Sequence, residues 1–142
     1  MTPTPKKYAN ATLFLAGFTA AIEVWLATIV VGESGSTMIA FLVGFLFGPL
    51  GFLALLAWRR KTHPTRVRML FWVTVVVAIA GMAVLGWDSM RERPKLTGTI
   101  PVRLSPLLVA SGQWLVVLAV WARLVFVEGK EKRATASPEK KP

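Results

Sequence analysis

The sequence contains no cysteine, one histidine and few charged side chains, and each of these shortages excludes a class of protein. Without cysteine the chain has no disulfide framework, no thiolate metal site and no thiol nucleophile. A single histidine, His63, is too few for most imidazole metal cages or for a haem held by two histidines. Charged residues make up 17% of the 142 residues and hydrophobic residues 54%, whereas soluble domains carry about 25% charged residues. The composition therefore excludes a disordered chain and disfavours an ordinary soluble globule.

Four long hydrophobic segments occupy most of the chain. A helix needs about 20 mainly apolar residues to cross a hydrocarbon core about 30 Å thick, and the segments 12–31, 37–58, 69–87 and 107–127 meet this requirement. Because every backbone N–H and C=O must be paired inside a bilayer, we expect each segment to be a helix. The first segment is too long for the apolar part of a cleaved signal peptide, so we expect it to be retained.

The predicted fold class is all-α: a polytopic membrane protein with four transmembrane helices in an antiparallel bundle. One domain, 1–127, holds the four helices, and the charged C-terminal tail, 128–142, is predicted to be disordered. Thirteen of the seventeen Lys and Arg residues fall at the N-terminus, in the second loop, or in the end of the last span and the tail. Basic residues mark the cytoplasmic side, so both termini are predicted to be cytoplasmic. This topology and the compact size favour the inner (plasma) membrane of a bacterium.

The second loop carries the densest group of basic residues. We call it the basic loop, and its five cations are Arg59, Arg60, Lys61, Arg66 and Arg68. Each basic residue near an anionic surface contributes about 1 kcal/mol, so we expect this loop to contact anionic lipid headgroups and to fix the orientation of the chain. An acidic protein partner is the alternative. Membrane orientation accounts for the net charge of +10, and without a recognition module no nucleic acid partner is expected.

Small residues at helical spacing predict which faces of the helices pack together. In the first span the small residues lie on the same face as Glu23, opposite a face of large residues that runs from Phe14 to Ile29. The second and third spans also have a seam of small residues. The glycines that we expect at helix contacts are Gly44, Gly48, Gly51 and Gly81. These seams favour a compact bundle with a surface left over for a partner.

Glu23 is the one acidic residue well inside a predicted span. It falls near the middle of the first span, where an ionisable side chain is costly unless it has a partner. Gln113, in the fourth span, is predicted at a similar depth and is the preferred partner, with Thr19 and Thr28 as local alternatives. Two interpretations remain open: a structural hydrogen bond between helices, or a group that carries protons or binds a cation.

The segment Ala21-Ile22-Glu23-Val24, in the first of four short helices, resembles the small multidrug resistance transporters. In that family a lone membrane-embedded Glu in the first helix exchanges protons for cationic drugs in an antiparallel homodimer, so the resemblance implies that role for Glu23. This chain is longer, and it lacks the family's aromatic and proline pattern in the second and third spans. Its charge bias also favours one fixed orientation. The resemblance covers these four residues and the number of helices, and Glu23 is the one residue whose role it implies here.

No group of residues predicts catalysis, a metal site or a cofactor. Polar residues inside the spans are scarce, whereas a membrane enzyme needs several that converge. We therefore expect a small integral inner-membrane protein without catalytic activity, acting as an accessory or assembly subunit of a larger membrane complex. The alternative is a small homo-oligomeric proton-coupled transporter or channel that uses Glu23, and the third hypothesis is a holin-like pore former. The expected partners are the lipid bilayer and other membrane subunits or further copies of this chain.

Overall fold

The computed structural model describes residues 4–31, 36–91 and 105–136, and these residues form four α-helices. Their bounds are α1 (Pro5–Val31), α2 (Ser36–Arg59), α3 (Pro64–Met90) and α4 (Ser105–Ala136). Three stretches are long and apolar enough to cross a membrane, namely Pro5–Ile29, Pro64–Met90 and Ser105–Glu131, and α2 adds the shorter apolar stretch Val43–Arg59. The all-helical prediction is confirmed for the described residues, and the three long apolar helices support a multi-pass membrane protein.

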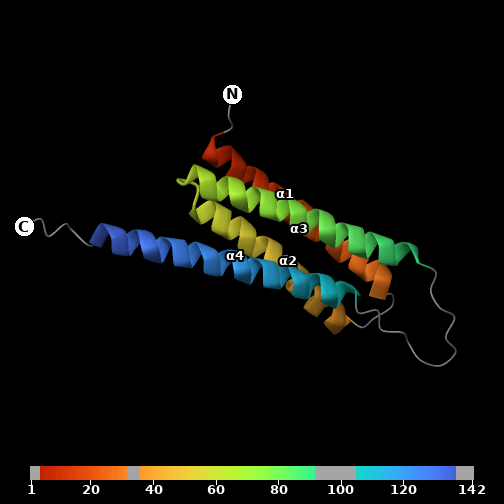
Figure 1. Ribbon diagram of the computed structural model, residues 1–142. Coiled ribbons are helices and arrows are strands. Elements are labelled where there is room, and N and C mark those ends of the chain that lie inside the picture. Colours follow the sequence, from red (N-terminus) through yellow and green to blue (C-terminus); the bar gives the residue numbers. More distant parts are fainter. Residues whose placement is uncertain (1–3, 32–35, 92–104, 137–142) are drawn as a thin grey trace, which may run out of the picture.

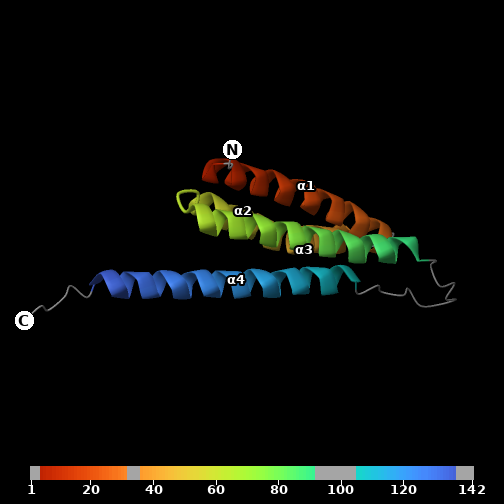
Figure 2. The ribbon, with the colours of Figure 1, turned by 45° about the horizontal axis from the view of Figure 1, so that its top comes forward.

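The four helices lie in three layers. Figure 2 shows α2 and α3 in the middle, with α1 on one side of them and α4 on the other. Successive helices alternate in direction, so the start of α1, the turn between α2 and α3, and the end of α4 lie at the same end of the molecule (Figure 1). We call this the basic end, because the basic loop is there. Because α2 and α3 lie between them, α1 and α4 contact each other at few points.

The outward and inward faces of α1 are those that the sequence predicted. Phe14 and Trp25 are 77% and 62% exposed, whereas Ala16, Ala20 and Ala27 are buried. Small side chains let the backbone of α1 come close to α2 and α3, and large side chains remain on the surface that faces away from them. The division of α1 into a small buried face and a large exposed face is confirmed.

The buried side chains form three clusters along the bundle. Nearest the basic end, the first cluster is Leu53, Leu56, Ala57, Leu70, Val117 and Leu124. The second cluster is Ala16, Ala20, Leu50, Ala54 and Val77. The third cluster, toward the opposite end, is Ala27, Leu46, Leu85, Val109 and Ala110. On α3, Gly81 falls between Val77 of the second cluster and Leu85 of the third, so these two clusters lie on either side of it.

The fourth helix is longer than the sequence predicted. It continues to Ala136, so the first part of the predicted disordered tail, from Glu128 to Ala136, is helical instead. Lys, Glu and Ala favour helix, and Glu128 and Glu131, three residues apart on one face, form salt bridges with arginines of the basic loop. The rest of the predicted tail lies outside the described residues.

Candidate functional site: a buried polar centre

Glu23 of α1 and Gln113 of α4 meet inside the bundle. The Gln113 amide Nε2 donates to both carboxylate oxygens of Glu23, at 2.8 Å to Oε1 and 2.9 Å to Oε2. Glu23 is fully buried and Gln113 is 4% exposed. The structure thus brings together the two residues that the sequence singled out, and it joins the two outer layers by a side-chain contact that passes through the middle layer.

Gly81 of α3 makes room for this contact. A Cβ atom added at Gly81 would lie 2.0 Å from Glu23 Oε1 and 2.8 Å from Gln113 Nε2. Both distances are shorter than any contact that a real Cβ makes, so the two polar side chains occupy the space that a side chain on α3 would fill. The sequence placed Gly81 in a seam for helix packing, and the structure shows that the seam admits a hydrogen-bonded pair rather than another backbone.

Three buried side-chain atoms have no partner within the described part of the chain, namely Gln113 Oε1, Thr19 Oγ1 and Trp114 Nε1. The ring of Trp114 lies against Gly48 of α2, so the first two belong to this centre. Thr19 lies one helical turn before Glu23 on the same buried face of α1. Thr28, the other local alternative, donates instead to the backbone carbonyl of Trp25, at 2.7 Å. The polar centre therefore consists of Glu23, Gln113 and Thr19, and it retains an unused acceptor.

The hydrogen-bonding groups of this centre can satisfy the carboxyl group of Glu23 whether it is ionised or protonated. An ionised carboxylate only accepts hydrogen bonds, and the Gln113 amide supplies a donor to it. A protonated carboxyl group has one O–H donor, and Gln113 Oε1, on the same amide, is an acceptor with no other partner among the described residues. No cation of the described chain pairs with Glu23, so hydrogen bonding rather than ion pairing satisfies this group.

The surroundings of the centre are mostly apolar in the part of the chain that the structure describes. The second and third clusters close it off along the bundle axis. From the side, a cavity of about 280 Å³ between α3 and α4 reaches Gln113, and the rest of its lining is Val, Leu, Ala and Gly. Toward the basic end the described residues include two more buried polar side chains, Thr12 and Thr74, but each donates to a backbone carbonyl of its own helix, that of Tyr8 or of Leu70.

The glycines of α2 fall into two groups. A Cβ at Gly48 would lie 2.6 Å from the ring of Trp114, so Gly48 is a contact between α2 and α4, as expected. Gly44 and Gly51 are exposed and have open space where a Cβ would be, so they make no helix contact within the described part of this chain, and the expectation that they lie at a helix contact stays a prediction. The reason for the open space is that α1 and α4 lie against other faces of α2, and the outward face stays uncovered.

The basic loop is only partly free to contact lipid. Arg60 Nε lies 2.9 Å from Glu128 Oε1, and Arg66 lies 3.3 Å from Glu128 Oε1 and 2.5 Å from Glu131 Oε2. Arg59, Lys61 and Arg68 are exposed. Sequence reasoning missed the role of Glu128 and Glu131, because their spacing on α4 becomes meaningful only when α4 lies beside the loop. Two of the five predicted lipid-contacting cations therefore hold α4 in place.

Comparisons with known proteins add nothing to this description. No protein-family model matches the chain, and no curated protein and no solved structure matches it either. Among the described residues, no group of three or more His, Asp or Glu side chains is placed to hold a metal ion. The structure thus describes an all-helical protein in which three helices are long and apolar enough to cross a membrane, with a buried side-chain hydrogen bond between α1 and α4. Its function is argued from these features.

Proposed function

We propose that this chain is a non-catalytic subunit of a larger complex in a bacterial inner membrane, with four membrane-spanning helices and cytoplasmic termini. Its role is to bind another membrane subunit through a helix–helix contact. The observation that carries the proposal is a stripe of small residues on the outward face of α2, which we call the α2 stripe: Ala40, Gly44 and Gly51.

The α2 stripe differs from the other outward faces of the protein. On α1 the exposed face holds mostly large side chains such as Phe14 and Trp25, which suit contact with lipid chains, with Gly17 and Ala21 among them. The α2 stripe instead leaves the helix backbone accessible, and small residues four apart are the pattern by which membrane helices approach each other closely. A lipid chain gains little from such a surface, whereas a second helix gains van der Waals contact along its length.

The other small-residue seams are already used inside the chain. Ala16 and Ala20 on α1, and Ala78 on α3, are buried in the bundle. An intermolecular contact therefore has to use an exposed surface. Small residues are also exposed on α1, at Gly17 and Ala21, and on α4, at Gly112 and Ala119, but the α2 stripe is favoured because it places two exposed glycines on one helix face. The enclosed polar centre fits the same interpretation, because a hydrogen bond between α1 and α4 stabilises the scaffold that presents α2.

Replacing the glycines of the α2 stripe tests this proposal. The double variant Gly44→Leu/Gly51→Leu should lose its partner, because two leucines hold a second helix away from the backbone of α2. Native mass spectrometry of the tagged protein, gently extracted from its own membrane, should show wild type at fixed stoichiometry with a larger subunit. We expect the double variant to be recovered without that subunit.

The matched control is Gly17→Leu, which places the same side chain on an exposed glycine of α1 that also has open space around it. This variant should keep the partner. Retention of the partner by both variants, or its loss from both, would contradict a contact through α2. A wild-type protein that is recovered as copies of itself alone would assign the α2 stripe to self-association and overturn the accessory role.

A second candidate is a homo-oligomeric proton-coupled transporter or channel that uses Glu23. The observation in its favour is the unused acceptor Gln113 Oε1, on a residue that also lines the side cavity. In vesicles, this candidate requires wild type to carry protons and Glu23→Gln to abolish the flux, since an amide has no carboxyl proton to exchange but keeps the volume and one oxygen that accepts from Gln113 Nε2.

We expect no proton flux from wild-type vesicles, because the cavity is apolar and the clusters close the centre along the bundle axis. A pH-sensitive dye trapped inside the vesicles measures the flux, and the melting temperature of Glu23→Gln shows whether the fold survives. Flux in wild type that disappears in a folded Glu23→Gln protein would establish the transporter in place of the accessory subunit.

A further inference from the structure

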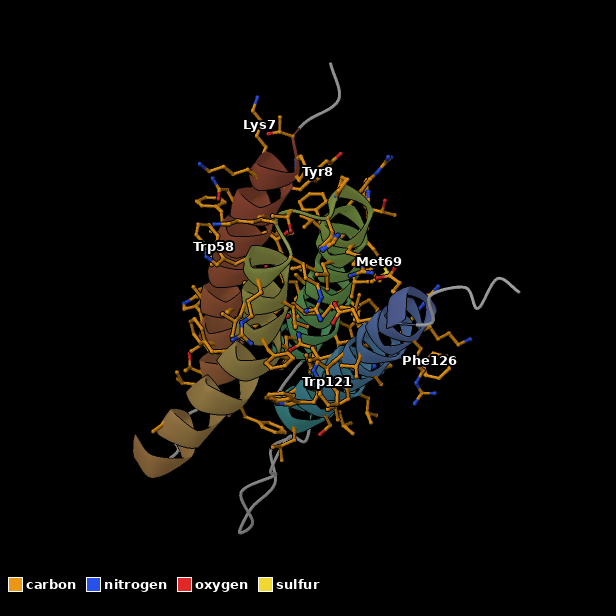
Figure 3. The ribbon with its side chains drawn as sticks, turned by 90° about the vertical axis from the view of Figure 1, so that its left-hand side faces the viewer. Lys7, Tyr8, Trp58, Met69, Trp121 and Phe126 are labelled. Carbon is orange, nitrogen blue, oxygen red and sulfur yellow. The ribbon has the colours of Figure 1, made fainter. Side chains whose placement is uncertain are left out.

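A pocket opens at the basic end, between the start of α3 and the second half of α4. Its volume is about 530 Å³. The turn before α3 contributes His63, and α3 contributes Arg66 and Met69. The residues on the α4 side are Arg123, Leu124, Val127 and Glu131, and Glu131 is paired with Arg66. Figure 3, a view from this end of the bundle, shows Met69 directed from α3 toward α4, whereas Phe126 on α4 projects away from the other helices.

The charges around this pocket do not cancel. Arg60 and Arg66 form salt bridges with Glu128 and Glu131, so two cations face two acids. Arg123 is exposed and forms no salt bridge with another described residue. The surplus positive charge of the cluster therefore lies on Arg123, at the rim of the pocket.

The beginning of α3 adds a partial positive charge to the same place. Pro64 occupies the first turn of the helix, and the preceding residue, His63, makes no side-chain hydrogen bond that caps it. The first backbone N–H groups of a helix have no acceptor within the helix, and the helix dipole favours an anion there. His63 and Pro64 both line the pocket, so these donors lie beside it.

The wall of the pocket is apolar. Met69, Leu124 and Val127 line it beside the charged residues, and Leu124 belongs to the first buried cluster. An occupant that satisfies both parts has an anionic group for Arg123 and a hydrocarbon chain for the wall. A free anion satisfies only the rim.

We propose that this pocket binds an anionic phospholipid, with its phosphate at Arg123 and the start of α3 and an acyl chain along Met69, Leu124 and Val127. The proposal rests on the membrane insertion that the proposed function includes, but not on the accessory role. It gives the basic end a specific lipid site, in addition to general attraction between the exposed cations and the membrane surface.

Native mass spectrometry with defined lipids tests this site. The chain is purified in a neutral detergent and titrated with equal amounts of phosphatidylglycerol and phosphatidylcholine. We expect wild type to retain one phosphatidylglycerol, and Arg123→Gln to bind it about five- to tenfold more weakly, because one basic contact near an anionic headgroup contributes about 1 kcal/mol. Arg123→Lys, which keeps the charge, should bind within about twofold of wild type.

The matched control is Arg68→Gln, which removes an exposed cation that does not line the pocket. It should bind phosphatidylglycerol as wild type does, and an equal loss in Arg68→Gln and Arg123→Gln would overturn the site. So would equal retention of the two lipids. Inorganic phosphate at millimolar concentration should leave the lipid in place, and displacement would show that the pocket takes a free anion instead. None of these readouts depends on whether a protein partner is present.

Discussion

Gly81→Ala should destabilise the fold by about 3 kcal/mol, at the upper end of the cost of overpacking a buried site. The added methyl carbon would lie 2.0 Å from Glu23 Oε1 and 3.0 Å from Glu23 Cδ. The carboxylate is the end of a flexible side chain, but any movement away from α3 also separates it from Gln113. The free energy of unfolding in detergent micelles, measured by titration with SDS and followed by circular dichroism, reports this loss.

Gly86→Ala is the matched control on the same helix. Nothing lies within 4 Å of a Cβ at Gly86, and alanine is a better helix former than glycine by about 1 kcal/mol, so this variant should be as stable as wild type or more stable. In a Glu23→Ala background, Gly81→Ala should cost less than about 1 kcal/mol, since the carboxylate that it displaces is absent. A similar cost in both backgrounds would place the strain somewhere other than at the polar centre.

Gln113→Leu should destabilise the protein by about 1–3 kcal/mol, the cost of leaving a buried polar group without its hydrogen bond. The amide of Gln113 is the only described partner of the Glu23 side chain, and leucine offers it no donor. The double variant Glu23→Leu/Gln113→Leu should recover most of the loss, because replacing both members of a buried polar pair by apolar residues is often close to neutral. The same SDS titration measures all three proteins.

Ser111→Leu is the control for Gln113→Leu. It makes a polar-to-leucine change on an exposed position of α4 near Gln113, and it should leave the free energy of unfolding within about 0.5 kcal/mol of wild type. Equal stability of the Gln113 and Ser111 variants would mean that the hydrogen bond contributes nothing to the fold. The polar centre would then have no structural role.

The sequence predicted the polar pair from two features that need no tertiary information. An acid in the middle of a hydrophobic run needs a partner, and Gln113 is at matching depth in the fourth run. The part played by Gly81 was not predictable, because the sequence does not tell which helix lies between the other two. For the same reason, the sequence does not tell what Gly44 and Gly51 contact. Their pattern identifies a face of α2 that admits close contact, but not whether that contact is made within this chain.

The sequence also does not tell which arginines of the basic loop form salt bridges. Arg60 and Arg66 cannot be told from Arg59 and Arg68 by type or by position in a basic run, yet the first two form salt bridges with Glu128 or Glu131. The difference arises because α4 continues past the predicted end of its span and lies beside the loop. A charge-based prediction of lipid contact therefore assigned these two arginines to lipid, although they bind acids of the same chain.

By itself, the sequence determined the helices, the division of α1 into a buried and an exposed face, and the need to partner Glu23. These follow from local properties: the length of apolar runs, the periodicity of a helix and the cost of burying a polar group. Only the tertiary structure decided which helices form the middle layer, which glycines are covered and which cations are paired. Those outcomes depend on contacts between segments far apart in the chain, and many arrangements of four apolar helices satisfy the same local pattern.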